Sequence, residues 1–436
     1  MKDKQSKQWL LLLIAVLLAT FMHCFYSLVF VAAEQIEDAQ MNRPRGNDSD
    51  LYPAWLGTRE LLVNHRDPYS PEVTADIQRG VWGRTVDARN PGDPKDQSRF
   101  AYPLYVVFVL APIVLFPFPL AKNLFIAGAI ITGILSVWCW LRLFHPGCSR
   151  FQFAIYSVLF LGSWPFVLAW RVHQPALLAF TLISAAIAAT STGKLKLAGV
   201  LLAFSAIKPQ SVIGIVGWLL LWSLSRWRDR KGLFLSFTLT FTLMLLAAEI
   251  MLPGWIWKWR EAMSAYLQYA PLPGVYLEML FGNRIGKVVG ILVTLGISLF
   301  CWKSRRDEPH TDRFKLAPTL ILAANLAITP VWHAYDHIFL LPSAILLWEW
   351  RERFFCLKPV QRGILRFSVL SVLWQWLAGL IAVAVVMIAP KLALNLRVLP
   401  YISILLFPAV ILTSLMLIGR SRLSGTLRTT RQIEIL

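Results

Sequence analysis

Charged residues are scarce in this chain of 436 residues, where they make up 15% of the total. Soluble domains carry about 25% charged residues, whereas this chain is 57% hydrophobic and contains 19 Trp and 26 Phe. Much of the sequence falls into apolar runs near the length of about 20 residues that a membrane-spanning helix needs. The composition therefore excludes a soluble globular domain, and we expect an all-α polytopic membrane protein.

Cysteine is also rare, with five residues spread along the chain: Cys24, Cys139, Cys148, Cys301 and Cys356. These cysteines form no Cys-x-x-Cys pair and no other spacing typical of metal ligands. Most of them lie in or beside apolar runs, where cysteine behaves as a small hydrophobic side chain. The sequence thus offers no cysteine-based metal site.

Acidic residues number only 24 against 43 Lys and Arg, which gives a net charge of +19. Half of the acidic residues lie between Glu34 and Asp96, so the rest of the chain carries the positive excess. The basic residues gather at the ends of apolar runs, in "SRWRDRK", "KSRRDEPH", "WEWRERF" and "GRSRLSGTLRTTR". This pattern is typical of cytoplasmic loops. A nucleic-acid-binding protein would need a basic face on a soluble domain, so we expect no nucleic-acid partner.

The apolar runs predict about 11–12 transmembrane helices in one integral membrane domain, residues 1–436. The candidate spans are residues 9–33, 101–118, 121–143, 151–170, 174–191, 195–225, 233–252, 285–302, 314–331, 337–350, 367–390 and 398–419. The first run is too long for the core of a signal peptide. Three lysines before it place the N-terminus in the cytoplasm.

Alternating the spans from a cytoplasmic N-terminus puts the basic loops and the tail, residues 420–436, inside. Two segments, 34–100 and 253–284, then lie outside the cell membrane. The short basic stretches around 142–150 and 194–196 also fall outside, against the charge rule. The number of spans between residues 119 and 225 is accordingly the least constrained.

Two of these segments carry further local signals. The run 195–225 is too long for one straight span, and Lys208 stands before Pro209, which cannot donate to the helix ladder. We therefore expect the helix to break there. In 253–284, the stretch "LPGWIWKWREAMSAYLQYAPLPG" mixes Trp and Tyr with a few charges, which favours a short helix in the membrane interface.

The long first outer segment, 34–100, contains "NDSDLYPAW", in which Asp48 and Asp50 have the Asp-x-Asp spacing of a metal-binding carboxylate pair. The following "PAWLGTRELLVNH" predicts a short helix, which "RDPYSP" ends. A long loop with its own helix and turns tends to be functional. The two carboxylates are therefore candidates for a catalytic base, a metal site or a helix cap.

The order of several motifs resembles glycosyltransferase family 87. These motifs are "YPAWLGTRELL" after Asp50, then "DPYS", "FAYPLYVVFVLAPIVLFPF", "HQPALLAFTLISAAIAA", "KLKLAGVLLAFSAIKPQ" and "TPVWHAYDHIFLLP". Members are bacterial membrane enzymes of the GT-C fold, related to polyprenol-phosphate-mannose-dependent mannosyltransferases. The resemblance covers about residues 9–350 and depends on the succession of loose motifs. His173-Gln174-Pro175 departs from the commoner Gly-Gln-x-Asn, and Lys208 is directly followed by proline.

The resemblance implies transfer of a mannose-like sugar from a polyprenyl-phosphate donor to a hydroxyl of a lipid or glycan acceptor outside the cell membrane. One carboxylate suffices as base, because the lipid phosphate leaves as an anion. The family's loop carboxylate corresponds to Asp50, and a single base implies inversion at the sugar carbon. We expect no cofactor and no metal, since nucleotide sugars are made in the cytoplasm. Asp48 is a secondary candidate, with two alternatives: it raises the pKa of Asp50 by its like charge, or it only faces solvent.

Further side chains are candidates for binding the substrate. They are Arg59, Tyr102, Gln174, Lys208, His333, Asp336 and His337. Arg59 can instead lie in the interface, and Tyr102 and Gln174 can serve in packing and at a helix start. Lys208 in an apolar run is expected to face a cavity or an anion, and Asp336 can orient either it or a histidine. His333 and His337 are spaced to share a face of an α-helix, where they could contact the phosphate or a metal.

The main alternative is a transporter or lipid flippase, in which Lys208, Glu249 and Asp336 would line a path through the membrane. A broken helix at Pro209 would then form part of its substrate site. A structural protein of cell-envelope synthesis is a third class. The sequence has no internal repeat and concentrates its acidic residues in one outer segment, which favours the transferase.

Overall fold

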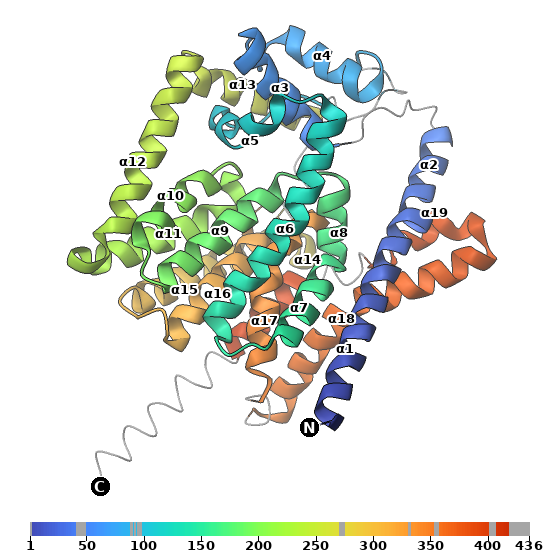
Figure 1. Ribbon diagram of the computed structural model, residues 1–436, viewed down its shortest axis with the longest axis vertical. Coiled ribbons are helices and arrows are strands. Elements are labelled where there is room, and N and C mark those ends of the chain that lie inside the picture. The colour runs from blue at the N-terminus through green and yellow to red at the C-terminus, as the bar shows by residue number, and fades with distance from the viewer. Residues whose placement is uncertain are drawn as a thin grey trace.

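The computed structural model describes residues 2–40, 49–87, 90, 93, 98–269, 275–329, 333–352, 357–400 and 407–417. Every regular element within these residues is a helix, so the chain is an all-α protein (Figure 1). Asp48 and the predicted tail 420–436 lie outside the described residues, as does a part of the predicted outer segment 253–284.

Five helices in the described residues are long and apolar enough to cross a membrane. They are the continuous run Gln5–Gln40, α6 (Phe118–Phe144), α12 (Trp227–Met251), α15 (Asn283–Ser304) and α18 (Pro359–Ile388). A sixth candidate consists of α7 (Arg150–Leu161) and α8 (Trp164–Arg171), which meet at an angle of 60°. The first run contains α1 (Lys2–Phe25), a π-helical turn (Tyr26–Phe30) and α2 (Val31–Gln40), so it extends into the predicted outer segment.

The other predicted spans are shorter helices, and the number of candidate spans is therefore smaller than the 11–12 expected. These helices are α5 (Val107–Val114), α9 (Ala176–Ser191), α10 (Leu195–Ser205), α11 (Pro209–Ser225), α16 (Asp312–Ile328) and α17 (Leu341–Glu349). Most side chains of α9 and α16 are buried. A helix that is apolar all round can lie inside a large helical protein as well as in lipid, and hydropathy does not distinguish the two.

The predicted break at Lys208 is present, because α10 ends at Ser205 and Pro209 begins α11. The two helices form a hairpin instead of one broken span. The Ser223 hydroxyl at the end of α11 donates to the Arg230 carbonyl over 2.5 Å. At the start of α10, Leu195 lies beside Gly232. Both outer ends of the hairpin therefore lie near residues 230–232, and Lys208 lies at its tip.

The basic loops gather at one end of the molecule, which we call the basic end. Arg230 is buried there and pairs with Glu308 at 2.9 Å, which joins the start of α12 to the segment after α15. His145 Nδ1, in the loop after α6, lies 2.6 Å from Glu349 Oε2. Residues 142–150 thus lie beside the basic "WEWRERF" motif. The stretch 194–196 also lies at this end, next to Gly232.

This arrangement corrects the predicted threading between residues 119 and 225. The two basic stretches that seemed to break the charge rule lie with the other basic loops, at one end of the molecule. The error arose because residues 101–118 were counted as a span, although Phe100 and Val114 both pack against residues 51–64. The hairpin of α10 and α11 was also counted as a single span.

The opposite end of the molecule holds α3 (Leu51–Asn64), α4 (Pro71–Trp82) and α13 (Trp255–Tyr269), far from the N-terminus (Figure 1). Helices α3 and α13 were both predicted, and their segments touch. Lys258 Nζ on α13 lies 2.7 Å from Asp67 Oδ2, and the Trp259 indole donates to the Ala101 carbonyl over 3.2 Å. The predicted outer segments 34–100 and 253–284 therefore meet. We call this the Asp50 end.

Local chemistry explains how α3 and α4 are held. The Ser70 hydroxyl caps α4 by accepting from the Val73 amide, and Pro71 follows at the first helical position, where its missing N–H costs nothing. Gly57 on α3 allows the Phe100 ring to pack directly on the helix, since a Cβ there would lie 2.3 Å from Phe100 Cδ2. The segment before α5 is thereby packed against α3.

The remaining described elements are η2 (Leu104–Val106), α14 (Tyr276–Phe281), η3 (Ala334–Leu340), η5 (Pro390–Leu392), α19 (Ala393–Leu396) and the helix Phe407–Leu417. The last falls within the predicted span 398–419.

Candidate functional site

Asp50 stands at the N-cap position of α3 and is tied to the segment that follows α8. Its backbone N–H donates to the Val172 carbonyl over 2.8 Å. The Gln174 side-chain amide donates to Asp50 Oδ2 over 2.7 Å. Among the described residues, the Asp50 carboxylate makes no capping hydrogen bond to α3. Its side chain thus points to Gln174 and does not serve as a helix cap.

The segment 171–174 presents Gln174 through an unusual backbone conformation. His173 has φ of 57°, in the left-handed region that few non-glycine residues adopt. The backbone N–H of Gln174 then donates to the Ala169 carbonyl over 2.8 Å, and this hydrogen bond ends α8. Gln174 is buried, and Pro175 begins the next helix. The His173-Gln174-Pro175 segment therefore places the Gln174 side-chain amide on Asp50.

Lys208 and Asp336 form a buried ion pair at the tip of the α10–α11 hairpin. Lys208 Nζ lies 2.6 Å from Asp336 Oδ1, and only 9% and 1% of the two side chains are exposed. Asp336 Oδ2 is buried without a hydrogen-bond partner among the described residues. Lys208 is therefore buried and paired with a carboxylate, and its side chain does not extend to an interface. The ion pair thus uses Asp336 Oδ1 and leaves Oδ2 without a hydrogen-bond partner in the described part of the chain.

Tyr335 connects this ion pair to Asp50. Lys208 Nζ lies 5.0 Å from the centre of the Tyr335 ring. Burial raises the pKa of Tyr335 well above its ordinary value, and the nearby carboxylates of Asp50 and Asp336 raise it further. Tyr102 acts on Tyr335 in the same way. Asp50, Asp336 and Tyr102 are thus near enough to Tyr335 to raise its pKa, and Lys208 lies beside its ring.

The two histidines do not form the predicted pair. Residues Ala334–Leu340 form a 3₁₀-helix, which has about three residues per turn. Residues four apart therefore do not share a face. His333 is exposed and its ring stacks on Tyr335 at 5.0 Å, whereas His337 is buried, with its ring 6.1 Å from that of Phe407.

Arg59 and Tyr102 have structural partners. Arg59 Nη1 donates to the Val114 carbonyl at the end of α5 over 2.6 Å, and its guanidinium lies 5.7 Å from the Trp55 ring centre. This contact joins α3 to α5. The Tyr102 carbonyl accepts from the Tyr69 hydroxyl over 2.8 Å. Tyr102 thus combines loop packing with its position near Tyr335.

The described residues contain no group of three or more His, Cys, Asp or Glu side chains that could hold a metal ion. Asp48, the second carboxylate of the Asp-x-Asp motif, lies outside these residues.

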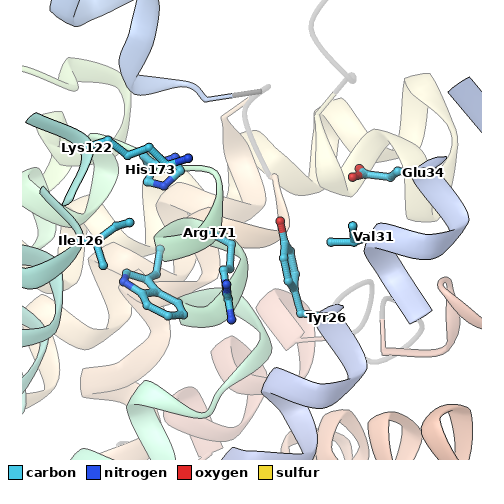
Figure 2. A pocket seen from close by; sticks show the side chains of 8 residues that line it. Tyr26, Val31, Glu34, Lys122, Ile126, Arg171 and His173 are labelled. Atoms are coloured by element: carbon cyan, nitrogen blue, oxygen red, sulfur yellow. The ribbon is translucent and has the colours of Figure 1, made fainter. Parts of the chain in front are cut away.

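A cavity of about 400 Å³ lies beside Arg171 and His173, which form part of its wall (Figure 2). It is lined by Tyr26, Val31, Glu34, Lys122, Ile126, Trp170, Arg171 and His173. The pKa of His173 is lowered to about 4, first by burial and then by the positive charges of Lys122 and Arg171. This cavity was not predicted, because Lys122 and Arg171 look like ordinary cations at the ends of apolar runs.

No protein-family model, curated protein or solved structure matches this chain.

Proposed function

We propose that this protein transfers a mannose-like sugar from a polyprenyl-phosphate donor to a hydroxyl group of a lipid or glycan acceptor. The reaction would take place at the extracytoplasmic face of the cell membrane, in a glycosyltransferase of the GT-C type. The succession of motifs that resembles glycosyltransferase family 87 supports this proposal. The five to six candidate membrane spans agree with a lipid-linked donor.

The observation that carries the proposal is the convergence on Tyr335. Asp50 and Asp336 lie far apart in the sequence, yet both carboxylates act on this one phenol. The printed contacts support this: Gln174 donates to Asp50 over 2.7 Å, Lys208 pairs with Asp336 at 2.6 Å, and Lys208 lies 5.0 Å from the Tyr335 ring centre.

The proposed reaction is a single displacement with Asp50 as the base. The acceptor oxygen forms a bond to the anomeric carbon of the sugar, while the bond from that carbon to the phosphate oxygen breaks. The acceptor proton passes to Asp50, and polyprenyl phosphate leaves as an anion. Configuration at the anomeric carbon is inverted, because only one displacement takes place.

The neighbours of Asp50 have distinct roles in this mechanism. Gln174 holds Asp50 Oδ2 and so fixes the orientation of the carboxylate, which general-base catalysis requires. Lys208 offers a positive charge to the sugar phosphate, and Asp336 compensates that charge in the empty site. Exchange of a Lys–carboxylate contact for a Lys–phosphate contact keeps the buried ammonium paired throughout.

A transporter or lipid flippase is the second candidate. The hairpin of α10 and α11, with a buried Lys208–Asp336 pair at its tip, resembles the broken helices that line substrate sites in transporters. In that case the Asp50–Gln174 contact would have no chemical role.

The test is turnover by the purified full-length chain in lipid nanodiscs. Polyprenyl-phosphate sugars and a bacterial membrane-lipid extract are supplied with and without a chelator, and release of polyprenyl phosphate is measured. We expect release by the wild-type protein in both conditions and none by Asp50→Asn. Asp76→Asn is the matched control, since Asp76 pairs with Arg66 and Arg79 at the same end of the molecule.

The outcomes separate the candidates. Release that needs a metal ion would contradict the metal-free base and favour the Asp-x-Asp site. Equal release by Asp50→Asn would exclude Asp50 as the base. If no donor is consumed, but the same lipids move between the leaflets of proteoliposomes, the flippase replaces the transferase.

A further inference from the structure

The cavity beside the segment 171–174 is built from three parts of the chain. The run Gln5–Gln40 contributes Tyr26, Val31 and Glu34, the first half of α6 contributes Lys122 and Ile126, and the end of α8 with its following residues contributes Trp170, Arg171 and His173. Two of these parts are candidate membrane spans. An occupant of the cavity is therefore in contact with helices that face lipid.

Three buried nitrogen atoms of residues in the cavity wall have no hydrogen-bond partner among the described residues. They are the Arg171 Nε, the Trp170 indole nitrogen and the His173 Nδ1. His173 is only 4% exposed, so water does not readily serve this nitrogen. Buried polar groups without partners are rare in proteins and often indicate a missing ligand or ion.

Charge within the cavity is divided between its two sides. Lys122 lies beside His173 on one side, Glu34 lies on the other, and Arg171 and Tyr26 stand between them (Figure 2). The Arg171 guanidinium lies 4.5 Å from the Trp170 ring centre and 5.3 Å from that of Tyr26. These rings hold the cation in place without neutralising it. No salt bridge joins Lys122 or Arg171 to a carboxylate in the described part of the chain.

We infer that this cavity binds the phosphate group of a lipid between Lys122, Arg171 and His173. The two cations, Lys122 and Arg171, match the negative charge and the oxygens of a phosphate. The apolar side chains of Val31 and Ile126 match the first part of a hydrocarbon chain. Glu34, at the far side, repels the phosphate and leaves it only the cationic end.

The cavity shares its wall with the Asp50 site. Val172 accepts from the Asp50 backbone, and Gln174 donates to the Asp50 carboxylate. Arg171 and His173, in the same four residues, face the cavity. Phosphate bound there and the Asp50 carboxylate are thus held by one short segment. The identity of the lipid as donor or acceptor rests on the proposed function, but its binding does not.

Binding is measured by calorimetry on the full-length chain in phosphatidylcholine nanodiscs, without turnover. The probes are farnesyl phosphate, farnesol and inorganic phosphate. We expect farnesyl phosphate to bind at least tenfold more tightly than the other two. Lys122→Gln and Arg171→Gln should each weaken binding about tenfold or more, as loss of a charged hydrogen-bonding partner does. Lys194→Gln, an exposed cation at the basic end, is the matched control and should bind as the wild type does.

Three results would overturn the inference: farnesol binding as tightly as farnesyl phosphate, inorganic phosphate doing so, or no farnesyl phosphate binding by the wild type. The first would exclude a phosphate site, and the second would identify a site for free anions. Unchanged affinity in both Lys122→Gln and Arg171→Gln would also exclude the cavity. Lys122 is half-exposed, so its variant tests the site even if Arg171→Gln does not fold.

The Asp50→Asn variant separates this inference from the proposed function. Its affinity for farnesyl phosphate should equal that of the wild type, since Asp50 does not line the cavity. If the wild type binds farnesyl phosphate but turns over none of the donors, the lipid site is supported and the transferase is contradicted. If the wild type turns over a donor, but Lys122→Gln binds farnesyl phosphate as tightly as the wild type, the transferase is supported and the lipid site is contradicted.

Discussion

At the scale of single residues, the buried pair of Lys208 and Asp336 sets the strongest constraint. Moving two charges out of water costs several kcal/mol for each ion, and their close contact offsets this cost only while both are present. At 2.6 Å, with both side chains nearly inaccessible, each charge depends on the other. The pair holds the α10–α11 tip against the segment that carries Tyr335.

Asp336→Asn should therefore lower the free energy of unfolding by about 3–5 kcal/mol, because it leaves a buried ammonium unpaired. The double variant Lys208→Met with Asp336→Leu should recover most of that stability and still lack turnover. Unfolding in mixed micelles measures the first effect, and polyprenyl phosphate release measures the second. A loss below about 1 kcal/mol in Asp336→Asn would contradict a buried, mutually dependent pair.

His173 predicts a dependence of stability on pH. Its pKa in the folded protein is about 4, below the ordinary value of 6.5, because of burial and the charges of Lys122 and Arg171. The unfolded chain binds a proton in this interval and the folded chain does not, so the free energy of unfolding falls as the pH decreases from 6.5 to 4. Above pH 6.5 this residue contributes no slope.

His173→Asn removes the titrating group and keeps a residue type that tolerates the left-handed backbone. The difference in unfolding free energy between the wild type and this variant should change across that pH interval. Because both proteins share all carboxylates and all other histidines, the contributions of these groups to the pH dependence of the unfolding free energy cancel in this difference. A constant difference would mean that His173 titrates equally in both states.

At the scale of elements, the position of α3 determines where Asp50 lies. The helix is fixed from several sides, by Arg59 on the end of α5 and by Phe100 on Gly57. Contacts from α13 to Asp67 and Ala101 hold the loops around it. Asp50, at the first turn of this helix, moves with it.

Gly57→Ala should lower stability by about 1–3 kcal/mol, the usual cost of overpacking, and should reduce turnover because α3 shifts. The Cβ of the new alanine would lie 2.3–3.0 Å from the Cδ2, Cγ and Cβ atoms of the buried Phe100 side chain. Gly217→Ala on α11 is the control, since nothing lies within 4 Å of its Cβ, and it should be neutral or slightly stabilising. Equal melting temperatures of both variants would show that Phe100 does not fix α3.

At the scale of the whole molecule, the charged segments sort to two ends. The basic end contains Arg230 and the loops around it, and the Asp50 end contains α3, α4 and α13 (Figure 1). The charge rule predicts that the basic end faces the cytoplasm. The proposed reaction needs the Asp50 end on the outside.

Cysteine labelling in intact bacterial cells tests this orientation. A membrane-impermeant maleimide should label Glu72→Cys on α4 and not Lys303→Cys on α15, both of which are exposed positions. The wild-type chain gives the background from its own cysteines. In inside-out vesicles the labelling should be reversed. Labelling of Lys303→Cys in intact cells would mean the opposite orientation.

Local chemistry made part of this architecture predictable. Proline after Lys208 predicted the break, and the aromatic, partly charged composition of 253–284 predicted α13. The pairing of Gln174 with Asp50 was not predictable, since it depends on the left-handed backbone at His173. Likewise, the spacing of His333 and His337 does not reveal a 3₁₀-helix. Each of these details depends on how distant segments pack.

The number of spans and the cavity were not predictable for a related reason. Hydropathy measures how apolar a segment is and not how long its helix is, and α9 and α16 have only 16 and 17 residues. Lys122 and Arg171 resemble cations that extend to the membrane interface. Only the three-dimensional arrangement brings them to one cavity.

The most direct test of the whole account is the rate of polyprenyl phosphate release by Asp50→Asn at saturating donor and acceptor. A general base contributes about 10²–10⁴-fold to the rate, so the turnover number should fall by that factor while the affinity for the donor stays unchanged. A variant that retains wild-type turnover would contradict Asp50 as the base, and with it the assignment of this site to sugar transfer.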